Sequence, residues 1–325
     1  MSVAVPALLE VDLRVERRAV TVQAGFRLEA GDRLAIFGTS GAGKTTILES
    51  IAGLTRLSGG SVRIGGRLVA GKLKGQTALA PRDRQVAIVR QPTTLFPHLT
   101  VEQNVAYGVR RSPGRNHVAE LLERLGLTVL ARARGAALSG GQRQRVALGR
   151  ALAGPFRVLL LDEPLSAVDL DAREALRQLA IETSLARGAA GILVTHDLAE
   201  AQGFADRLGI IDSGRLLQMG GAHEVVLSPA SRRVAELVGY GGFIPVPLTA
   251  GRWHAIHPDR VILGSRPERG LVLTGPVIST RPFGARYECT VSDRSGEHFT
   301  VHLDEAPPAG KVWMFTALDP PVVRA

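Results

Sequence analysis

The sequence is poor in several features that mark special classes of protein. It holds one cysteine, Cys289, among 325 residues, which excludes an internal disulfide framework and fits a reducing compartment. No apolar run approaches the roughly 18 residues that a membrane-spanning helix needs, so we expect no such helix. The first six residues carry no basic side chain and are soon followed by Glu10 and Asp12, so we expect no secretion signal.

Lysine is also scarce, although the chain is strongly basic. Four of the 40 basic residues are lysine, the arginines are scattered rather than clustered, and the formal net charge is +10. Such a balance favours an anionic partner, either a nucleic acid or membrane headgroups near a docking partner. Because the basic residues do not cluster, we expect no nucleic-acid partner. The length suits two domains, and 45% hydrophobic with 22% charged residues is typical of globular proteins.

A glycine-rich stretch carries the first chemical signal. Gly38, Gly43, Lys44 and Thr45 fill the pattern G-x-x-x-x-G-K-[ST], between an apolar run at 33–37 and helical spacing at 45–52. Glycines let the backbone N–H groups close around an anion, and the helix start adds its positive dipole end. Lys44 can reach the β- and γ-phosphates, and the Thr45 hydroxyl can ligate magnesium. An ordinary turn before a helix is the alternative, but the strand–loop–helix context predicts a nucleotide site.

The order of apolar runs predicts an α/β fold. Short alternating runs over 8–37 indicate an antiparallel sheet, and buried-strand runs follow at 85–90, 157–161, 191–195 and 208–211. Helical spacing between them implies a parallel sheet covered by helices, with a helical insertion at about 92–155. A last helix is predicted to 238. We therefore predict a P-loop domain at 1–238, a Gly/Pro linker at 239–247 and a small all-β domain at 248–325.

Three further residues complete a candidate hydrolytic site. Asp162 and Glu163 end the apolar strand 157–161, where Asp162 suits a magnesium ligand and Glu163 suits a general base for the attacking water. His196 ends the strand 191–195, where its imidazole could hydrogen-bond the γ-phosphate. The alternatives are a solvated strand end for the carboxylates and a structural role for the histidine.

A second glycine-rich helix start lies at 138–142. The Ser139 hydroxyl and the free N–H groups behind it can bind an anion, but no lysine is present, and a plain N-cap is the alternative. Two anion sites with a single lysine suggest that two copies of the chain share their nucleotides.

Together these motifs resemble the nucleotide-binding subunit of ABC transporters. Gly38–Thr45, Gln91, Leu138–Gln142, Leu159–Glu163, Ser166–Asp169 and His196 match Walker A, the Q-loop, the LSGGQ signature, Walker B, the D-loop and the H-loop. The resemblance covers about residues 8–238. It implies ATP and Mg²⁺, with Glu163, His196 and Gln91 catalytic, and with Thr45, Gln91 and Asp162 at the metal. The implied nucleotide-binding residues are Gly38, Thr39, Ser40, Gly41, Ala42, Gly43, Lys44, Thr45, Thr46, Ser139, Gly140, Gly141, Gln142 and Asp169.

The resemblance also implies partners. They are a second copy of the chain in a head-to-tail homodimer, an integral-membrane permease, and indirectly an extracytoplasmic solute-binding protein. The subunit would lie peripherally on the cytoplasmic face of the cell membrane. Residues 36–46 and 95–105 resemble bacterial importers, especially the molybdate type, whose tails carry oligomer-binding-like β-domains.

Several alternatives stay open beside a molybdate or oxyanion importer. They are an importer for iron, polyamine or sulfate, an exporter, and a non-transport ABC ATPase that acts on nucleic acid or ribosomes. One position departs from the family pattern, because Arg90 precedes Gln91 where an apolar or aromatic residue is commoner.

Overall fold

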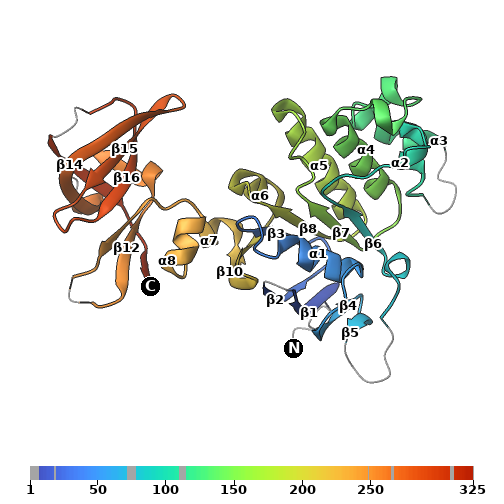
Figure 1. The fold of residues 1–325 in the computed structure, drawn as a ribbon, viewed down its shortest axis with the longest axis horizontal. Helices are drawn as coiled ribbons and strands as arrows, with labels where there is room; N and C mark the ends of the chain where they lie inside the picture. The colour runs from blue at the N-terminus through green and yellow to red at the C-terminus, as the bar shows by residue number, and fades with distance from the viewer. Residues whose placement is uncertain are drawn as a thin grey trace. The chain divides into compact units, whose positions relative to one another are not determined.

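The computed structural model describes residues 7–17, 20–71, 78–109, 115–247, 249–264, 267–307 and 311–324. The chain forms two compact units, residues 1–222 and residues 223–325, which are described separately below (Figure 1). No helix in the described ranges is both long enough and apolar enough to cross a membrane.

The first unit is built on one mixed sheet of order β5-β4-β1-β2-β10-β9-β3-β8-β7-β6 (Figure 1). Strands β1 and β2 pair antiparallel, as predicted for residues 8–37, and β4 and β5 extend this part. Strands β9, β3, β8, β7 and β6 run parallel, which confirms the predicted parallel sheet. The strands are β1 (Leu9–Glu16), β2 (Thr21–Leu28), β3 (Arg33–Phe37), β4 (Gly59–Ile64), β5 (Arg67–Gly71), β6 (Val86–Val89), β7 (Val158–Asp162), β8 (Ala190–Thr195), β9 (Arg207–Asp212) and β10 (Arg215–Gly221).

The central strands are apolar because both faces of the sheet are covered. All residues of β7 and β8 are buried, the pattern of a parallel strand with helices on each side. Parallel strands present their carboxyl ends at one edge of the sheet, which is where ligands bind in open α/β sheets. The ends of β3, β7 and β8, and the loops that follow them, therefore meet at one site.

Helices pack around this sheet, and α2, α3 and α4 lie within the range 92–155 that was predicted as a helical insertion. The helices of this unit are α1 (Lys44–Ala52), α2 (Val101–Ala106), α3 (Arg115–Arg124), α4 (Gly140–Ala153), α5 (Leu170–Ala186) and α6 (Leu198–Phe204), with 3₁₀ turns at Pro81–Asp83, Thr128–Leu130 and Gly135–Ala137. Helix α7 (Ala222–Leu227) begins at the last residue of this unit and belongs otherwise to the second. Ser139 caps α4, since its hydroxyl accepts a hydrogen bond from Gln142 N while the Gln142 side chain accepts from Ser139 N. The helix start predicted at 138–142 is thus confirmed.

The second unit is an all-β domain with one sheet of order β13-β17-β14-β15-β16-β11-β12-β18. Its core contains Phe299 and Phe315, whose rings meet edge to face with centroids 5.9 Å apart. The elements are α8 (Arg232–Leu237), β11 (Gly242–Pro245), β12 (Arg252–Ile256), β13 (Val261–Leu263), β14 (Gly270–Phe283), β15 (Arg286–Ser292), β16 (His298–Leu303), β17 (Val312–Leu318) and β18 (Val322–Arg324), with 3₁₀ turns at Pro258–Arg260 and Pro267–Arg269.

A group of charged side chains joins the neighbouring strands β15 and β16 to the 3₁₀ turn at Pro258–Arg260. His302 donates from Nδ1 to Asp259 Oδ1 at 2.7 Å, and Arg286 Nη1 donates to the same oxygen at 3.1 Å. Arg286 Nε also pairs with Asp304 Oδ1 at 3.1 Å, and the Phe283 ring stacks on His302. Burial alone would raise the pKa of Asp259, but the hydrogen bond and charge of His302, with His257 and Arg286, lower it.

Two details differ from the sequence-based prediction. The units divide at residues 222 and 223, ahead of the predicted boundary at 238, and the expected linker 239–247 contains β11, which pairs with β12 and β16. The last helix, predicted to 238, is confirmed as α8. Helix α7 ends at Leu227, Pro229 lacks the N–H that would continue it, and Ser231 caps α8 by accepting a hydrogen bond from Val234 N.

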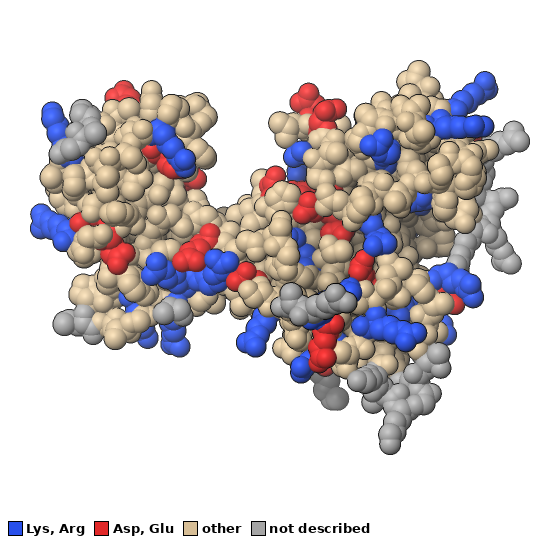
Figure 2. Space-filling model, viewed as in Figure 1, with Lys and Arg blue, Asp and Glu red and all other residues tan. Residues whose placement is uncertain are grey.

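Basic and acidic side chains are interspersed on the surface. On the face in Figure 2, Lys and Arg lie among Asp and Glu over each unit instead of gathering in one basic patch.

Candidate nucleotide site

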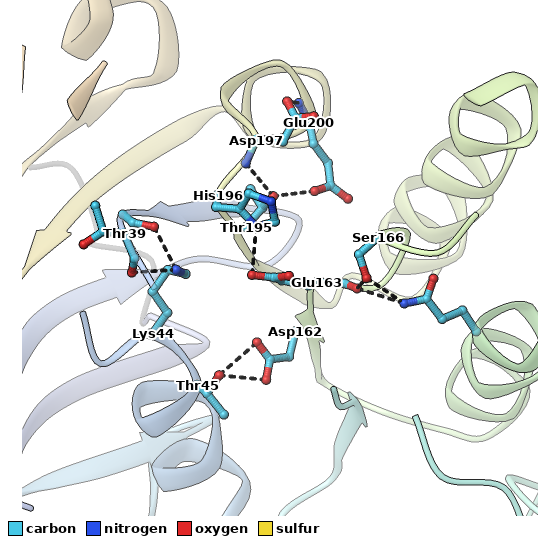
Figure 3. A network of polar contacts seen from close by, with 12 residues as sticks. Thr39, Lys44, Thr45, Asp162, Glu163, Ser166, Thr195, His196, Asp197 and Glu200 are labelled. Atoms are coloured by element: carbon cyan, nitrogen blue, oxygen red, sulfur yellow. Dashed lines mark hydrogen bonds and ion pairs between the residues drawn. The ribbon is translucent and has the colours of Figure 1, made fainter. Parts of the chain in front are cut away.

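The glycine-rich loop after β3 is hydrogen-bonded to its own lysine. Lys44 is buried, and its Nζ donates to Gly38 O at 2.8 Å and to Thr39 O at 3.0 Å (Figure 3). Gly43 has φ of 103°, which favours glycine, and a Cβ at Gly38 would lie 2.2 Å from Ile211 O. Burial lowers the pKa of Lys44, and the carboxylates of Glu163 and Asp162 counteract that shift.

Thr45 and Asp162 meet although 117 residues separate them in the chain. The Thr45 hydroxyl lies 2.9 Å from Asp162 Oδ2 and 3.1 Å from Oδ1 (Figure 3). Burial raises the pKa of Asp162, and the hydrogen bond from Thr45 opposes this effect. A hydroxyl and a carboxylate side by side are hard oxygen donors, which magnesium prefers. The pair therefore fits the magnesium-ligand roles expected for these two residues.

Glu163 occupies a strained backbone conformation directly after β7. Its φ is 44°, which is uncommon outside glycine, and its N–H donates to Val194 O at 2.9 Å. Its carboxylate accepts a hydrogen bond from His196 Nδ1, with Oε1 2.9 Å away (Figure 3). The end of β8 thus orients the carboxylate that follows β7, which brings two of the three predicted catalytic residues together.

Gln144 holds this backbone in place and was missed by the sequence analysis. It is buried on α4, and its Nε2 donates to Glu163 O at 3.3 Å and to Ser166 Oγ at 2.9 Å. Its Oε1 accepts from Ala167 N at 2.8 Å. The sequence signal that could have found Gln144 is its place two residues after Gln142, on the helix that begins at the signature motif.

A second group that the sequence analysis missed flanks His196 in the chain and consists of Thr195, Asp197 and Glu200. Thr195 donates its hydroxyl hydrogen to Glu200 Oε2 and accepts from Asp197 N at 3.0 Å, while Glu200 N donates to Asp197 Oδ1 (Figure 3). Burial raises the pKa of Glu200, and the hydrogen bond from Thr195 opposes it. These bonds fix the turn from β8 into α6 and so hold the backbone that carries His196.

The predicted residues fall into two groups in space. One pocket among the described residues is lined by Val20, Ser40, Gly41, Gly43, Lys44, Thr45, Thr46, Gln91, Asp162 and Glu163. Thr39 and His196 are joined to this pocket by the hydrogen bonds described above, and Ala42 is buried under the loop. Ser139–Gln142 and Asp169 begin α4 and α5 and are not among its described lining residues. A Cβ at Gly141 would lie 2.6 Å from Ala167 O, so α4 begins directly against the loop that leads to Asp169.

Comparison with known proteins decides the family. The sequence profile described as ABC transporter matches residues 22–166. The sn-glycerol-3-phosphate import ATP-binding protein of Rhizobium johnstonii is 36% identical over 86% of this chain and 82% of its own length. The chain belongs to the ABC transporter ATP-binding family. It is an ABC-type ATPase, and the predicted P-loop fold with a C-terminal β-domain is confirmed.

Other ABC proteins extend the comparison. The sulfate/thiosulfate import ATP-binding protein of Chromobacterium violaceum is 42% identical over 72% of this chain, and the match spans 63% of that relative's length. Further relatives are named for import of Fe(3+) ions and of spermidine and putrescine. Among solved structures, the ATP-binding cassette MJ0796, a dimer in a post-hydrolysis state with ADP and Pi, covers 66% of this chain and 98% of its own, with 26% identity and a TM-score of 0.56.

Proposed function

We propose that this chain is the ATP-hydrolysing subunit of an importer and energises a separate integral-membrane permease. The observation that carries the proposal is the pocket in which the phosphate loop, the Thr45–Asp162 pair and the Glu163–His196 pair converge. The relatives named as import ATP-binding proteins support the direction of transport.

The chain's own residues supply each requirement of phosphoryl transfer to water. Lys44 and the loop N–H groups bind the β- and γ-phosphates, which positions them for attack. Glu163 accepts the proton of the attacking water, and His196 keeps the carboxylate oriented through its 2.9 Å contact and faces the γ-phosphate. The left-handed backbone at Glu163, fixed by Gln144, aims this carboxylate into the pocket.

Thr45, Asp162 and Gln91 would hold magnesium. The hydroxyl and carboxylate oxygens already lie within 3.1 Å of each other, and Gln91 lines the same pocket. When bound, the ion would neutralise charge that develops on the phosphate oxygens.

The second group of residues requires a second copy of the chain. Ser139, Gly140, Gly141, Gln142 and Asp169 lie at the starts of α4 and α5 and are not among the described lining residues of the pocket in their own chain, so we assign them to the nucleotide of a head-to-tail partner. The dimeric ABC structure bound to ADP and Pi supports this assignment. ATP binding would close such a dimer and hydrolysis would reopen it, which drives the permease, with a solute-binding protein acting on its outer side. The subunit would then lie at the cytoplasmic face of the membrane.

The cargo is proposed as a class. The relatives are named for sulfate, sn-glycerol-3-phosphate, Fe(3+) and polyamine import, and these names favour such cargoes over molybdate. Molybdate import stays a prediction from the sequence alone.

The test combines chemistry with uptake. Cells that lack this subunit are complemented with wild type or Glu163→Gln and offered labelled sulfate, glycerol 3-phosphate, iron, spermidine and molybdate. We expect wild type alone to restore one uptake. Mg-ATP hydrolysis by the purified chain without restored uptake of any of these would contradict the importer role, and absence of hydrolysis would contradict the ATPase chemistry.

A further inference from the structure

Strand β6 is attached to helix α1 at both of its ends by arginines. At its start, the buried Arg84 donates from Nη1 to Ser50 O at 3.0 Å and to Ile51 O at 2.9 Å, the last carbonyls of α1. At its end, Arg90 Nη2 donates to Glu49 Oε1 at 2.6 Å. Because β6 is the terminal strand of the described sheet, it pairs with β7 on one side alone. The two arginines therefore bind both ends of this edge strand to α1.

Glu49 can fix the position of Arg90 relative to helix α1. It lies four residues after Thr45, on the same face of the helix, and side chains on a helix lean toward its N-terminus. Its side chain is 16% exposed, and its second oxygen, Oε2, accepts from Thr55 Oγ1 at 3.0 Å and pairs with Arg17 at 3.5 Å. The Glu49 carboxylate is therefore bound through both oxygens: Oε1 contacts Arg90, and Oε2 contacts Thr55 and Arg17.

Arg90 is joined by one peptide bond to Gln91, which lines the pocket with Thr45 and Asp162. We propose that Arg90 is a positioning residue: its ion pair with Glu49 fixes the backbone that presents Gln91 to the Thr45–Asp162 pair. The inference rests on the proposed role of these three residues at magnesium. It also gives a reason for an arginine at a position where the family usually has an apolar or aromatic residue.

The experiment measures how strongly Mg²⁺ and nucleotide reinforce each other's binding. The probe is the fluorescent, non-hydrolysable analogue mant-AMP-PNP, titrated into the full chain with saturating Mg²⁺ and again in EDTA. For Arg90→Met we expect the Mg²⁺-dependent gain in affinity to fall about tenfold, as when a group that orients a metal ligand is lost. The affinity in EDTA should stay at the wild-type value, and Arg90→Lys should recover most of the gain.

Two comparisons separate positioning from a general effect of charge. Arg17→Met removes the other arginine from Glu49 but leaves the Gln91 backbone untouched, so we expect a change of less than about twofold. In a Gln91→Ala background, Arg90→Met should add nothing further. Should Arg90→Met fail to fold, judged by thermal unfolding, Glu49→Met breaks the same ion pair from α1 and should give the same loss.

The proposal would be overturned if Arg90→Met and Glu49→Met both kept the wild-type Mg²⁺-dependent gain in nucleotide affinity. It would also be overturned if Arg17→Met reduced this gain as much as Arg90→Met does. A further reduction of about tenfold by Arg90→Met in the Gln91→Ala background would overturn it as well. Absence of any Mg²⁺ gain in the wild type is a different result, because it would overturn the proposed magnesium site itself.

Discussion

The two units each contain a compact group of ionisable side chains, and the groups differ in what their charges face. In the first unit, Lys44, Asp162 and Glu163 line a pocket, and burial shifts the pKa of Lys44 down and of Asp162 up. In the second unit, Asp259 is surrounded by His302 and Arg286, and its pKa is lowered. Burial sets the direction of the pKa shift at Lys44 and Asp162, whereas at Asp259 the neighbouring His302, His257 and Arg286 together outweigh burial.

The difference shows how a binding site can be told from a structural ion network. A structural network supplies its own counter-charges, so its charged forms are stabilised in the folded chain. A site for phosphate and metal buries charged groups, which destabilises their charged forms. The bound ligand then supplies the opposite charges that stabilise them. The following changes test this contrast, in order of decreasing effect.

Glu163→Gln should reduce ATP turnover by about two orders of magnitude or more, because a positioned general base is lost. Nucleotide binding should persist, since the amide keeps the size of the side chain. Phosphate release and nucleotide titration measure the two effects. The matched change in the other group, Asp259→Asn, should leave turnover unchanged; equal turnover in both variants would erase the contrast.

Lys44→Ala should weaken ATP binding by about tenfold to a hundredfold, the effect of losing a hydrogen bond to a charged group. Lys311→Ala, an exposed lysine in the second unit, is the control and should bind ATP as wild type does. Isothermal titration of both variants makes the comparison. Equal affinities would remove Lys44 from the phosphate site.

Gln144→Leu should lower the free energy of unfolding by about 1–3 kcal/mol, because Ala167 N and Ser166 lose a buried partner. It should also lower turnover, since the Glu163 backbone loses a restraint. Gln178→Leu is the control, because Gln178 is exposed and its side chain bonds to Glu174 on the same helix. Thermal unfolding of the two variants gives the difference, and a smaller loss for Gln144→Leu than for Gln178→Leu would contradict the assignment.

Asp259→Asn should have the smallest effect, below about 1 kcal/mol, because the Asp259 side chain is 53% exposed. A lowered pKa stabilises the fold above the unfolded value of about 3.9, and this contribution disappears as the pH falls through the folded value. The variant should therefore be less stable than wild type at neutral pH and equal to it in acid. Both tryptophans, Trp253 and Trp313, lie in the second unit, so tryptophan fluorescence during urea unfolding reports on that unit in the intact chain. A difference that persists in acid would contradict the role of Asp259.

The sequence predicted residues that the structure brings together, because its motifs are local. Each of Lys44, Glu163 and His196 lies at a strand end or helix start, and the parallel topology brings such ends together at one edge. The roles of Gln144 and Arg90 were not predictable, since they depend on contacts to Glu163 and Glu49, residues 19 and 41 positions away. No periodicity in the chain records those distances.

The same limit explains the errors in the fold. Strand β10 was missed because its residues are partly exposed and end in glycines, so they show no apolar alternation. The expected linker contains glycine and proline at high density, yet Gly242 lets β11 approach Phe299 closely, where a Cβ would lie 2.3 Å from that side chain. Glycine there serves close packing instead of a flexible connection.

The left-handed backbone at Glu163 affects which substitutions at this position would stabilise the fold. A non-glycine residue in this conformation costs about 1–3 kcal/mol, and its carboxylate repels that of Asp162. Glu163→Gly would relieve both penalties, so selection for folding alone would favour an inactive chain. Libraries of this chain that are screened for thermal tolerance alone should therefore lose glutamate at position 163 first.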